Sequence, residues 1–183
     1  LLTADVDRAM IVCGSNVGEN DELMIPIKAA IGDRLVGVFD ETTPEKLAET
    51  AFDAIDVMTE TDVDVLVGIG GGSSLDIARQ ASVFEADGRS LAELREEAHS
   101  GSIEPPDPRD NRTPVVVVPT TFAGADVSTG GSIEVLSATK SPTGQPMCTS
   151  GSLMPIANFS DPALLETTPS SALAGSAMNG FNK

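Results

Sequence analysis

A glycine-rich stretch in the middle of the chain carries the clearest sign of chemistry. The segment from Val63 to Gln80, VDVLVGIGGGSSLDIARQ, places four glycines and two serines between two apolar segments. Glycines at such a turn let the backbone approach a ligand closely, and a helix that begins there aims its N–H groups at an anion. We expect this turn to bind a pyrophosphate through the following residues: Gly70, Gly71, Gly72 and Ser73.

Asp76 stands one helical turn further on and has a different expected role. Because phosphate repels a carboxylate, we expect Asp76 to accept hydrogen bonds from a sugar hydroxyl, a carboxamide or nearby backbone. The turn matches neither the G-x-G-x-x-G fingerprint, whose third glycine is replaced by Ser73, nor a phosphate-binding loop that ends in GK[ST]. A purely structural strand-to-helix turn is the alternative.

A second turn with suitable side chains follows a later apolar run. In VVVVPTTFAGADVSTGGS, Thr120 and Thr121 come directly after four valines. Ligands bind at the carboxyl ends of the strands in open α/β sheets, and two hydroxyl groups there could bind a nucleotide. A local turn in which the hydroxyls bond their own backbone is the alternative.

Strands and helices alternate over the first two thirds of the chain. Apolar runs predict strands over residues 8–16, 34–40, 63–70 and 114–121. The pattern predicts helices over residues 21–32, interrupted near Pro26, and over 43–62, 73–86 and 89–101. In the helix over 43–62, Thr43 is the expected N-cap and Pro44 the first helical residue. Continuous Val/Ile strands that alternate with helices indicate an α/β fold: a Rossmann-like parallel sheet with helices on both faces.

The pattern loosens after Thr121. Residues 130–137 and 154–161 are expected to be extended, and a helix capped by Thr168 runs to the last residue. That helix has no terminating glycine, so we expect the chain to be incomplete. The predicted organisation is a dinucleotide-binding domain over residues 1–165, followed by the start of a truncated helical domain over 166–183.

Composition narrows the possible partners and the environment. The formal net charge is −17, from 28 acidic and 11 basic residues, and such a surface repels nucleic acid. Dispersed acid with few lysines is typical of adaptation to high salt, although an ordinary acidic cytosolic protein is the alternative. The two cysteines lack CxxC spacing, no apolar run could span a membrane, and the N-terminus does not read as a signal peptide. We expect a cytoplasmic protein with free thiols, and the sequence leaves a homodimer open.

Taken together, these motifs resemble the iron-containing (group III) alcohol dehydrogenase family. The family motif GGGSxxD is found at Gly70–Ser73 and Asp76, the motif PTT at residues 119–121, and SDPALLETTP at 160–169 resembles the linker into its helical domain. The stretch PTTFAGADVS is most similar to the maleylacetate reductase branch. The resemblance implies hydride transfer between NAD(P)H and an alcohol/carbonyl pair, with Thr120 and Thr121 beside the cofactor and Lys140 near the ribose or nicotinamide.

The sequence departs from the family pattern in its first strand. Where the family often carries an Asp that holds the adenosine ribose, this chain has Gly14. The missing carboxylate leaves room for a 2′-phosphate, so NAD and NADP are both open as the cofactor.

A second departure concerns the metal, Fe²⁺ or Zn²⁺ in the family. The family's metal helix supplies an Asp and, four residues on, a His, but this chain has Asn179 and Lys183. Asn is a weak ligand and a protonated Lys repels a cation, so we expect no metal on this helix. The remaining family histidines are not in the chain, and His99 is expected to be a solvated surface residue.

The resulting prediction is an NAD(P)-dependent oxidoreductase that resembles iron-containing alcohol dehydrogenases. Lys183 is a candidate catalytic cation that could stabilise a developing alkoxide in place of a metal, with a surface lysine as the alternative. A metal-free enzyme similar to maleylacetate reductase and a non-catalytic nucleotide-binding module are the competing hypotheses.

Overall fold

Five parallel strands form the central sheet of the structure, a computed structural model that describes residues 6–100, 103–106, 112–135, 147–150 and 154–181. They lie in the order β2-β1-β3-β4-β7. Their bounds are Ala9–Val12 (β1), Leu35–Phe39 (β2), Val65–Gly70 (β3), Val115–Pro119 (β4) and Ala157–Asn158 (β7). The predicted α/β class with a parallel sheet is therefore confirmed. The order in which strands are added reverses between β1 and β3: β2 lies on one side of β1, and the later strands lie on the other. Open α/β sheets bind ligands beyond the carboxyl ends of the strands at such a switch point.

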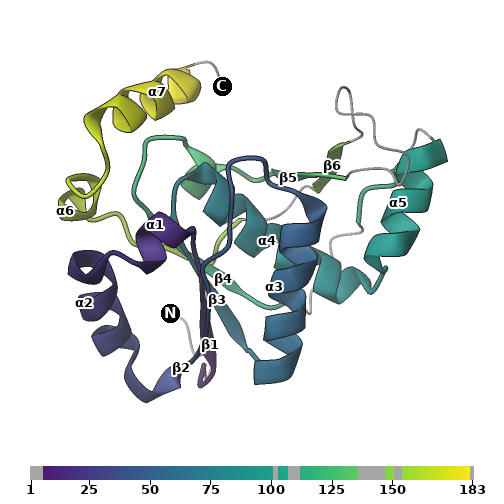
Figure 1. Cartoon of the computed structure of the whole chain (residues 1–183), viewed down its shortest axis with the longest axis horizontal. Helices are drawn as coiled ribbons and strands as arrows, with labels where there is room; N and C mark the ends of the chain where they lie inside the picture. Colours follow the sequence, from purple (N-terminus) through teal and green to yellow (C-terminus); the bar gives the residue numbers. More distant parts are fainter. Residues whose placement is uncertain (1–5, 101–102, 107–111, 136–146, 151–153, 182–183) are drawn as a thin grey trace.

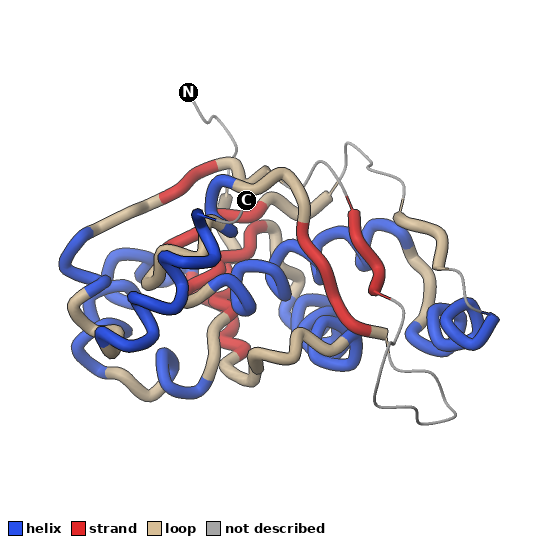
Figure 2. The backbone as a smooth tube through the Cα atoms, turned by 90° about the horizontal axis from the view of Figure 1, so that it is seen from above, coloured by secondary structure: helices blue, strands red, loops and turns tan. Residues whose placement is uncertain are grey.

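Helices cover both faces of the sheet (Figure 1; Figure 2, from above). Their bounds are Ser15–Gly18 (α1), Asp21–Ile31 (α2), Ala48–Thr61 (α3), Gly72–Asp87 (α4) and Leu91–Ser100 (α5). Alternate residues of β1 face opposite sides: Met10 and Val12 pack with α3, α4 and α5, whereas Ile11 and Cys13 pack with α2. This explains why β1 reads as a continuous apolar run.

A second, two-stranded antiparallel sheet joins β5 (Gly131–Glu134) to β6 (Met147–Ser150). The sequence predicted an extended segment at β5 but no strand at β6. Beyond β7 come α6 (Pro162–Leu165) and α7 (Ser170–Phe181), and two short 3₁₀ turns complete the described elements, η1 (Gly32–Arg34) and η2 (Ala125–Val127). Figure 1 shows α7 above the carboxyl edge of the sheet. α6 ends at Leu165, and the predicted domain boundary after this residue stays a prediction.

The start of α3 differs from the prediction. The helix begins at Ala48, not at Thr43, and Leu47 precedes it without a side-chain cap. Lys46 has a left-handed backbone with φ 53°, which a helix cannot contain. The Lys46 carbonyl accepts a hydrogen bond from the Glu134 amide at 2.8 Å. A contact distant in sequence therefore shortens the helix.

The predicted interruption of α2 was also wrong. Pro26 lies inside a continuous helix of 11 residues. A proline removes one backbone hydrogen bond, but Leu23 and Met24 are buried in the same helix, and the Asn20 side chain caps its start. Packing and capping outweigh the lost bond. Within the described residues, no helix is long and apolar enough to cross a membrane.

Candidate functional site

The glycine turn joins β3 to α4 at the carboxyl edge of the sheet. Gly70 has φ +130°, a conformation that other residues rarely adopt, and its carbonyl accepts a hydrogen bond from the Thr120 amide at 2.9 Å. Gly71 precedes α4 in an extended conformation with φ −78° and provides no side-chain cap. The strand therefore ends sharply, and no N-cap side chain bonds the first amides of α4.

The first amides of α4 have no hydrogen-bond partner among the described residues. The N–H groups of Gly72, Ser73 and Ser74 donate to no acceptor that the structure describes, and the first bond of the helix runs from Leu75 to the Gly71 carbonyl at 3.3 Å. Unpaired amides at the start of a 16-residue helix create a partial positive charge that suits an anion. Anion binding by this turn stays a prediction.

The loop after β4 lies against this turn. A Cβ atom on Gly71 would lie 3.5 Å from Thr121 Cγ2, and one on Gly72 would lie 3.2 Å from Ala123 Cβ. Thr120 is buried, and its carbonyl accepts a hydrogen bond from Thr168 Oγ1 at 2.8 Å. The structure thus brings Thr121 next to the glycine turn, as expected. Thr168, predicted to cap the last helix, instead ties that helix to the loop.

Gly14 lies on the other side of the glycine turn, at the end of β1. A Cβ atom on Gly14 would lie 3.0 Å from the carbonyl oxygen of Thr42. The Thr42 hydroxyl in turn shares a hydrogen bond of 2.7 Å with the Ser74 hydroxyl, at the start of α4. The loop after β2 therefore closes against Gly14 and occupies the space where a side chain would begin.

Asp40 gives this side of the site a negative charge. Phe39 pairs with Val12 across the sheet, so the next residue, Asp40, lies level with the end of β1. Its carboxylate packs over Gly18, where a Cβ atom would come within 2.8 Å of Asp40 Cβ. Burial and the nearby Asp40 charge raise the pKa of the Cys13 thiol to about 11.

Asp76 does not face open solvent. Its Oδ2 atom accepts a hydrogen bond from Lys46 Nζ at 3.0 Å, and its Oδ1 atom accepts one from Arg79 Nη2 at 2.5 Å. The side chain is 13% exposed. Both carboxylate oxygens thus have cationic partners within the protein, while a direct contact of Asp76 with a cofactor stays a prediction.

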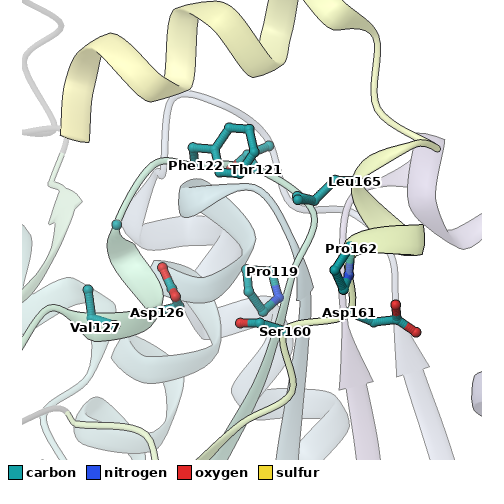
Figure 3. A pocket seen from close by; sticks show the side chains of 10 residues that line it. Pro119, Thr121, Phe122, Asp126, Val127, Ser160, Asp161, Pro162 and Leu165 are labelled. Carbon is teal, nitrogen blue, oxygen red and sulfur yellow. The ribbon is translucent and has the colours of Figure 1, made fainter. Parts of the chain in front are cut away.

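A cavity of about 310 Å³ opens beside Thr121 (Figure 3). Pro119, Phe122, Pro162 and Leu165 supply apolar walls. Asp126 and Ser160 supply oxygen atoms, and Asp126 Oδ2 accepts a hydrogen bond from Asn158 Nδ2 at 2.9 Å. The cavity lies beyond β4 and β7 rather than at the change of direction between β1 and β3, and Thr121 joins the two places.

Several predicted residues cannot be placed. Lys140 and Lys183 lie outside the described residues, and Asn179 lies in α7, where its side chain is not described. In the part of the chain that the structure describes, no group of three or more His, Cys, Asp or Glu side chains could hold a metal ion. The expected absence of a metal on the last helix stays a prediction.

The sequence analysis missed residues of two loops. Thr42 and Asp40 follow β2 as Thr120 and Thr121 follow β4, so the same rule on carboxyl ends would have found them. Asp126 and Ser160 gave no local signal, because only the packing of the loop after β4 against the segment around α6 brings them together.

Comparison with known proteins identifies relatives over most of the chain. The model of the family "Iron-containing alcohol dehydrogenase" matches residues 1–161. The chain is 29% identical over 105 residues to long-chain-alcohol dehydrogenase 1 of Geobacillus thermodenitrificans, covering 57% of this chain and 25% of that protein. It is 28% identical over 111 residues to maleylacetate reductase 1 of Cupriavidus pinatubonensis, covering 61% of this chain and 24% of that protein.

Solved structures share the fold. Sulfoacetaldehyde reductase from Bifidobacterium kashiwanohense, solved in complex with NAD⁺, superposes with a TM-score of 0.77 at 18% identity, covering 95% of this chain and 43% of that chain. The chain thus spans less than half of this solved neighbour, and its matches span about a quarter of the curated relatives.

Proposed function

Since the chain belongs to the iron-containing alcohol dehydrogenase family, we propose that it forms the dinucleotide-binding part of an NAD(P)-dependent oxidoreductase. The reaction is hydride transfer between the nicotinamide ring and an alcohol/carbonyl pair. One observation carries the proposal: the unpaired amides of α4 and the Thr121 loop meet at the carboxyl edge of the sheet. That edge is where doubly wound folds bind dinucleotides.

Each part of the site has a chemical task in this proposal. The amides of Gly72, Ser73 and Ser74 hold the pyrophosphate. The cavity beside Thr121 takes one of the two bases, because its Pro and Phe walls suit a flat ring and Asp126 can accept a hydrogen bond from an amino group. The carboxylate of Asp126 also disfavours phosphate there, which directs the phosphates towards α4.

The charge near Gly14 favours NAD over NADP. The resemblance implies that the adenosine ribose lies near Gly14. The Thr42 carbonyl oxygen is 3.0 Å from a Cβ atom built on Gly14, and the Asp40 carboxylate lies against Gly18, four residues further along the chain. A 2′-phosphate there would be repelled by the negative charge of the Asp40 carboxylate and would face the negative end of the Thr42 carbonyl dipole. We therefore propose NAD(H) as the cofactor, although the sequence alone left NADP open.

The family's metal has no assigned role here. Within the described residues no side-chain group fits it, so we derive no step through a metal ion. The proposed residues bind and orient the dinucleotide and exclude water from it.

The PTTFAG stretch and the similarity to maleylacetate reductase 1 of Cupriavidus pinatubonensis favour a second candidate, a reductase of that type. NADH oxidation by the full-length protein distinguishes the two. Turnover with maleylacetate but not with simple aldehydes would favour the second candidate.

Calorimetric titration with NADH and NADPH tests the proposed function. We expect NADH to bind more tightly, and Gly71→Val to weaken NADH binding by about tenfold or more, because a branched side chain covers the amides of α4. Asp40→Asn should reduce the preference for NADH. Gly175→Val is the matched control, since a Cβ atom there meets nothing within 4 Å.

Two outcomes would contradict the proposal. Unchanged NADH binding by a folded Gly71→Val variant would remove the glycine turn from the site. Equal binding of NADH and NADPH by the unmodified chain would remove the argument from Asp40.

We further propose that the protein works in the cytoplasm at high salt, which the buried thiol of Cys13 and the net charge of −17 support.

A further inference from the structure

Three charged side chains form a connected cluster at the start of α4, the helix that follows the glycine turn. Lys46 and Arg79 bind opposite oxygens of the Asp76 carboxylate, with nitrogen–oxygen distances of 3.0 and 2.5 Å. The side chains of Lys46, Asp76 and Arg79 are 25%, 13% and 1% exposed. Charges this far from water are costly unless their other donors are also bonded.

The remaining donors reach a third segment of the chain. Arg79 Nη1 donates to the Ser128 carbonyl at 2.8 Å, and Lys46 Nζ donates to the Ser132 hydroxyl at 3.1 Å. One cluster thus joins α4 to the loop after β2, which carries Lys46, and to residues 128–132. We name these three side chains the Lys46 clamp.

The backbone around Lys46 shows how firmly the clamp holds this loop. A left-handed φ of 53° is uncommon for a lysine, and such conformations persist only where the surroundings impose them. Here the side chain is bound to Asp76 and the carbonyl to the Glu134 amide. The same loop contacts the start of α4 through Thr42, whose hydroxyl bonds that of Ser74.

We infer that Lys46 is a positioning residue for dinucleotide binding. Through its ion pair with Asp76, it holds the loop of residues 40–47 against α4, and so fixes Thr42 and Asp40 beside the glycine turn. In this inference Asp76 acts through Lys46, whose ammonium group binds one of its two carboxylate oxygens while Arg79 binds the other. This inference rests on the proposed function.

The charges of the clamp provide a test that separates positioning from simple attraction. The three side chains carry a net charge of +1, from two cations and one anion. Lys46→Met lowers this charge, whereas Asp76→Asn raises it. If the cluster only attracted the pyrophosphate, the two variants would change binding in opposite directions. If it positions the loop, both variants weaken binding.

The experiment is calorimetric titration of the full chain with NADH, with a melting temperature for every variant. We expect Lys46→Met and Asp76→Asn each to weaken binding by about tenfold, and Lys46→Arg to restore most of it. Arg95→Met is the matched control, because Arg95 Nη2 forms a part-exposed ion pair with Glu49 on α3, away from the turn. It should leave NADH binding unchanged.

A further variant keeps the test valid if Asp76→Asn, which leaves Arg79 unpaired, does not fold. Lys46→Gly removes the side chain but suits the left-handed backbone, so it should keep the melting temperature while it weakens NADH binding.

Opposite shifts for Lys46→Met and Asp76→Asn, or unchanged binding by both Lys46→Met and Lys46→Gly, would overturn the inference while the proposed function stands. Failure of the unmodified chain to bind NADH would overturn both.

Discussion

At the residue scale, burial decides the chemistry of Cys13. The thiol is fully buried at the end of β1, and desolvation, with a contribution from Asp40, raises its pKa from 9.0 to about 11. A thiol that stays protonated is a poor nucleophile. Although Cys13 adjoins the proposed dinucleotide site, it is therefore not expected to take part in the reaction.

This shift predicts how stability changes at high pH. Between about pH 9 and pH 11 the thiol ionises in the unfolded chain but not in the folded one. The unfolded state then binds fewer protons, so the free energy of unfolding should fall as pH rises through this range. Urea denaturation at several pH values measures the slope. Cys13→Ala should make it shallower, and an identical slope in both proteins would contradict the assignment.

At the scale of elements, the glycine turn combines two different requirements. Gly70 is needed for its backbone, with φ +130°, whereas Gly71 has φ −78°, which any residue can adopt. The first residue ends β3 and the second leaves the start of α4 uncovered. Folding and ligand binding therefore depend on neighbouring but separable positions.

Substitution should separate them. Gly70→Ala forces a strained backbone and brings a methyl group to 3.2 Å from Ser74 Oγ, so we expect it to lower the free energy of unfolding by about 1–3 kcal/mol. Gly71→Ala makes only an ordinary contact with Thr121 and should change it by less than about 0.5 kcal/mol. The midpoints of urea denaturation compare the two. Equal losses would show that the turn has a different backbone conformation.

Local patterns were sufficient to predict the elements that carry the glycine turn. The apolar runs of β3 and β4 and the periodic helix α4 are encoded within their own segments. The start of α3 is not encoded within its own segment, because the conformation of Lys46 depends on contacts with Asp76 and Glu134. Likewise, no sequence pattern near these residues predicts that Thr42 lies against Gly14 or that Asp126 faces the segment around α6. Sequence patterns locate strand ends, but long-range contacts decide what surrounds them.

At the scale of the whole molecule, the net charge of −17 is the feature that most affects stability in dilute buffer. Acidic side chains even follow one another on the exposed face of α3, where Asp53, Asp56 and Glu60 are spaced by three and four residues and repel each other. Such repulsion opposes the compact state at low ionic strength.

Salt should therefore stabilise the protein. At 1 M salt the screening length is about 3 Å, so the melting temperature should rise steeply between dilute buffer and molar KCl, as circular dichroism can measure. Replacing the three acids of α3 by their amides should raise the melting temperature in dilute buffer and reduce its dependence on salt. A flat response in the unmodified chain would instead indicate an ordinary acidic protein.

The contact between Gly14 and the Thr42 carbonyl also restricts how this site can evolve. A Cβ atom on residue 14 would lie only 3.0 Å from the Thr42 carbonyl oxygen, so an aspartate there would require a shift of a few tenths of an ångström in the loop that Lys46 and Ser74 hold in place. Adding the ribose-binding carboxylate that the resemblance implies would therefore disturb neighbouring contacts, since substitutions at contacting residues do not act independently. We therefore expect an aspartate at position 14 to be tolerated only together with a compensating substitution in the loop that carries Thr42.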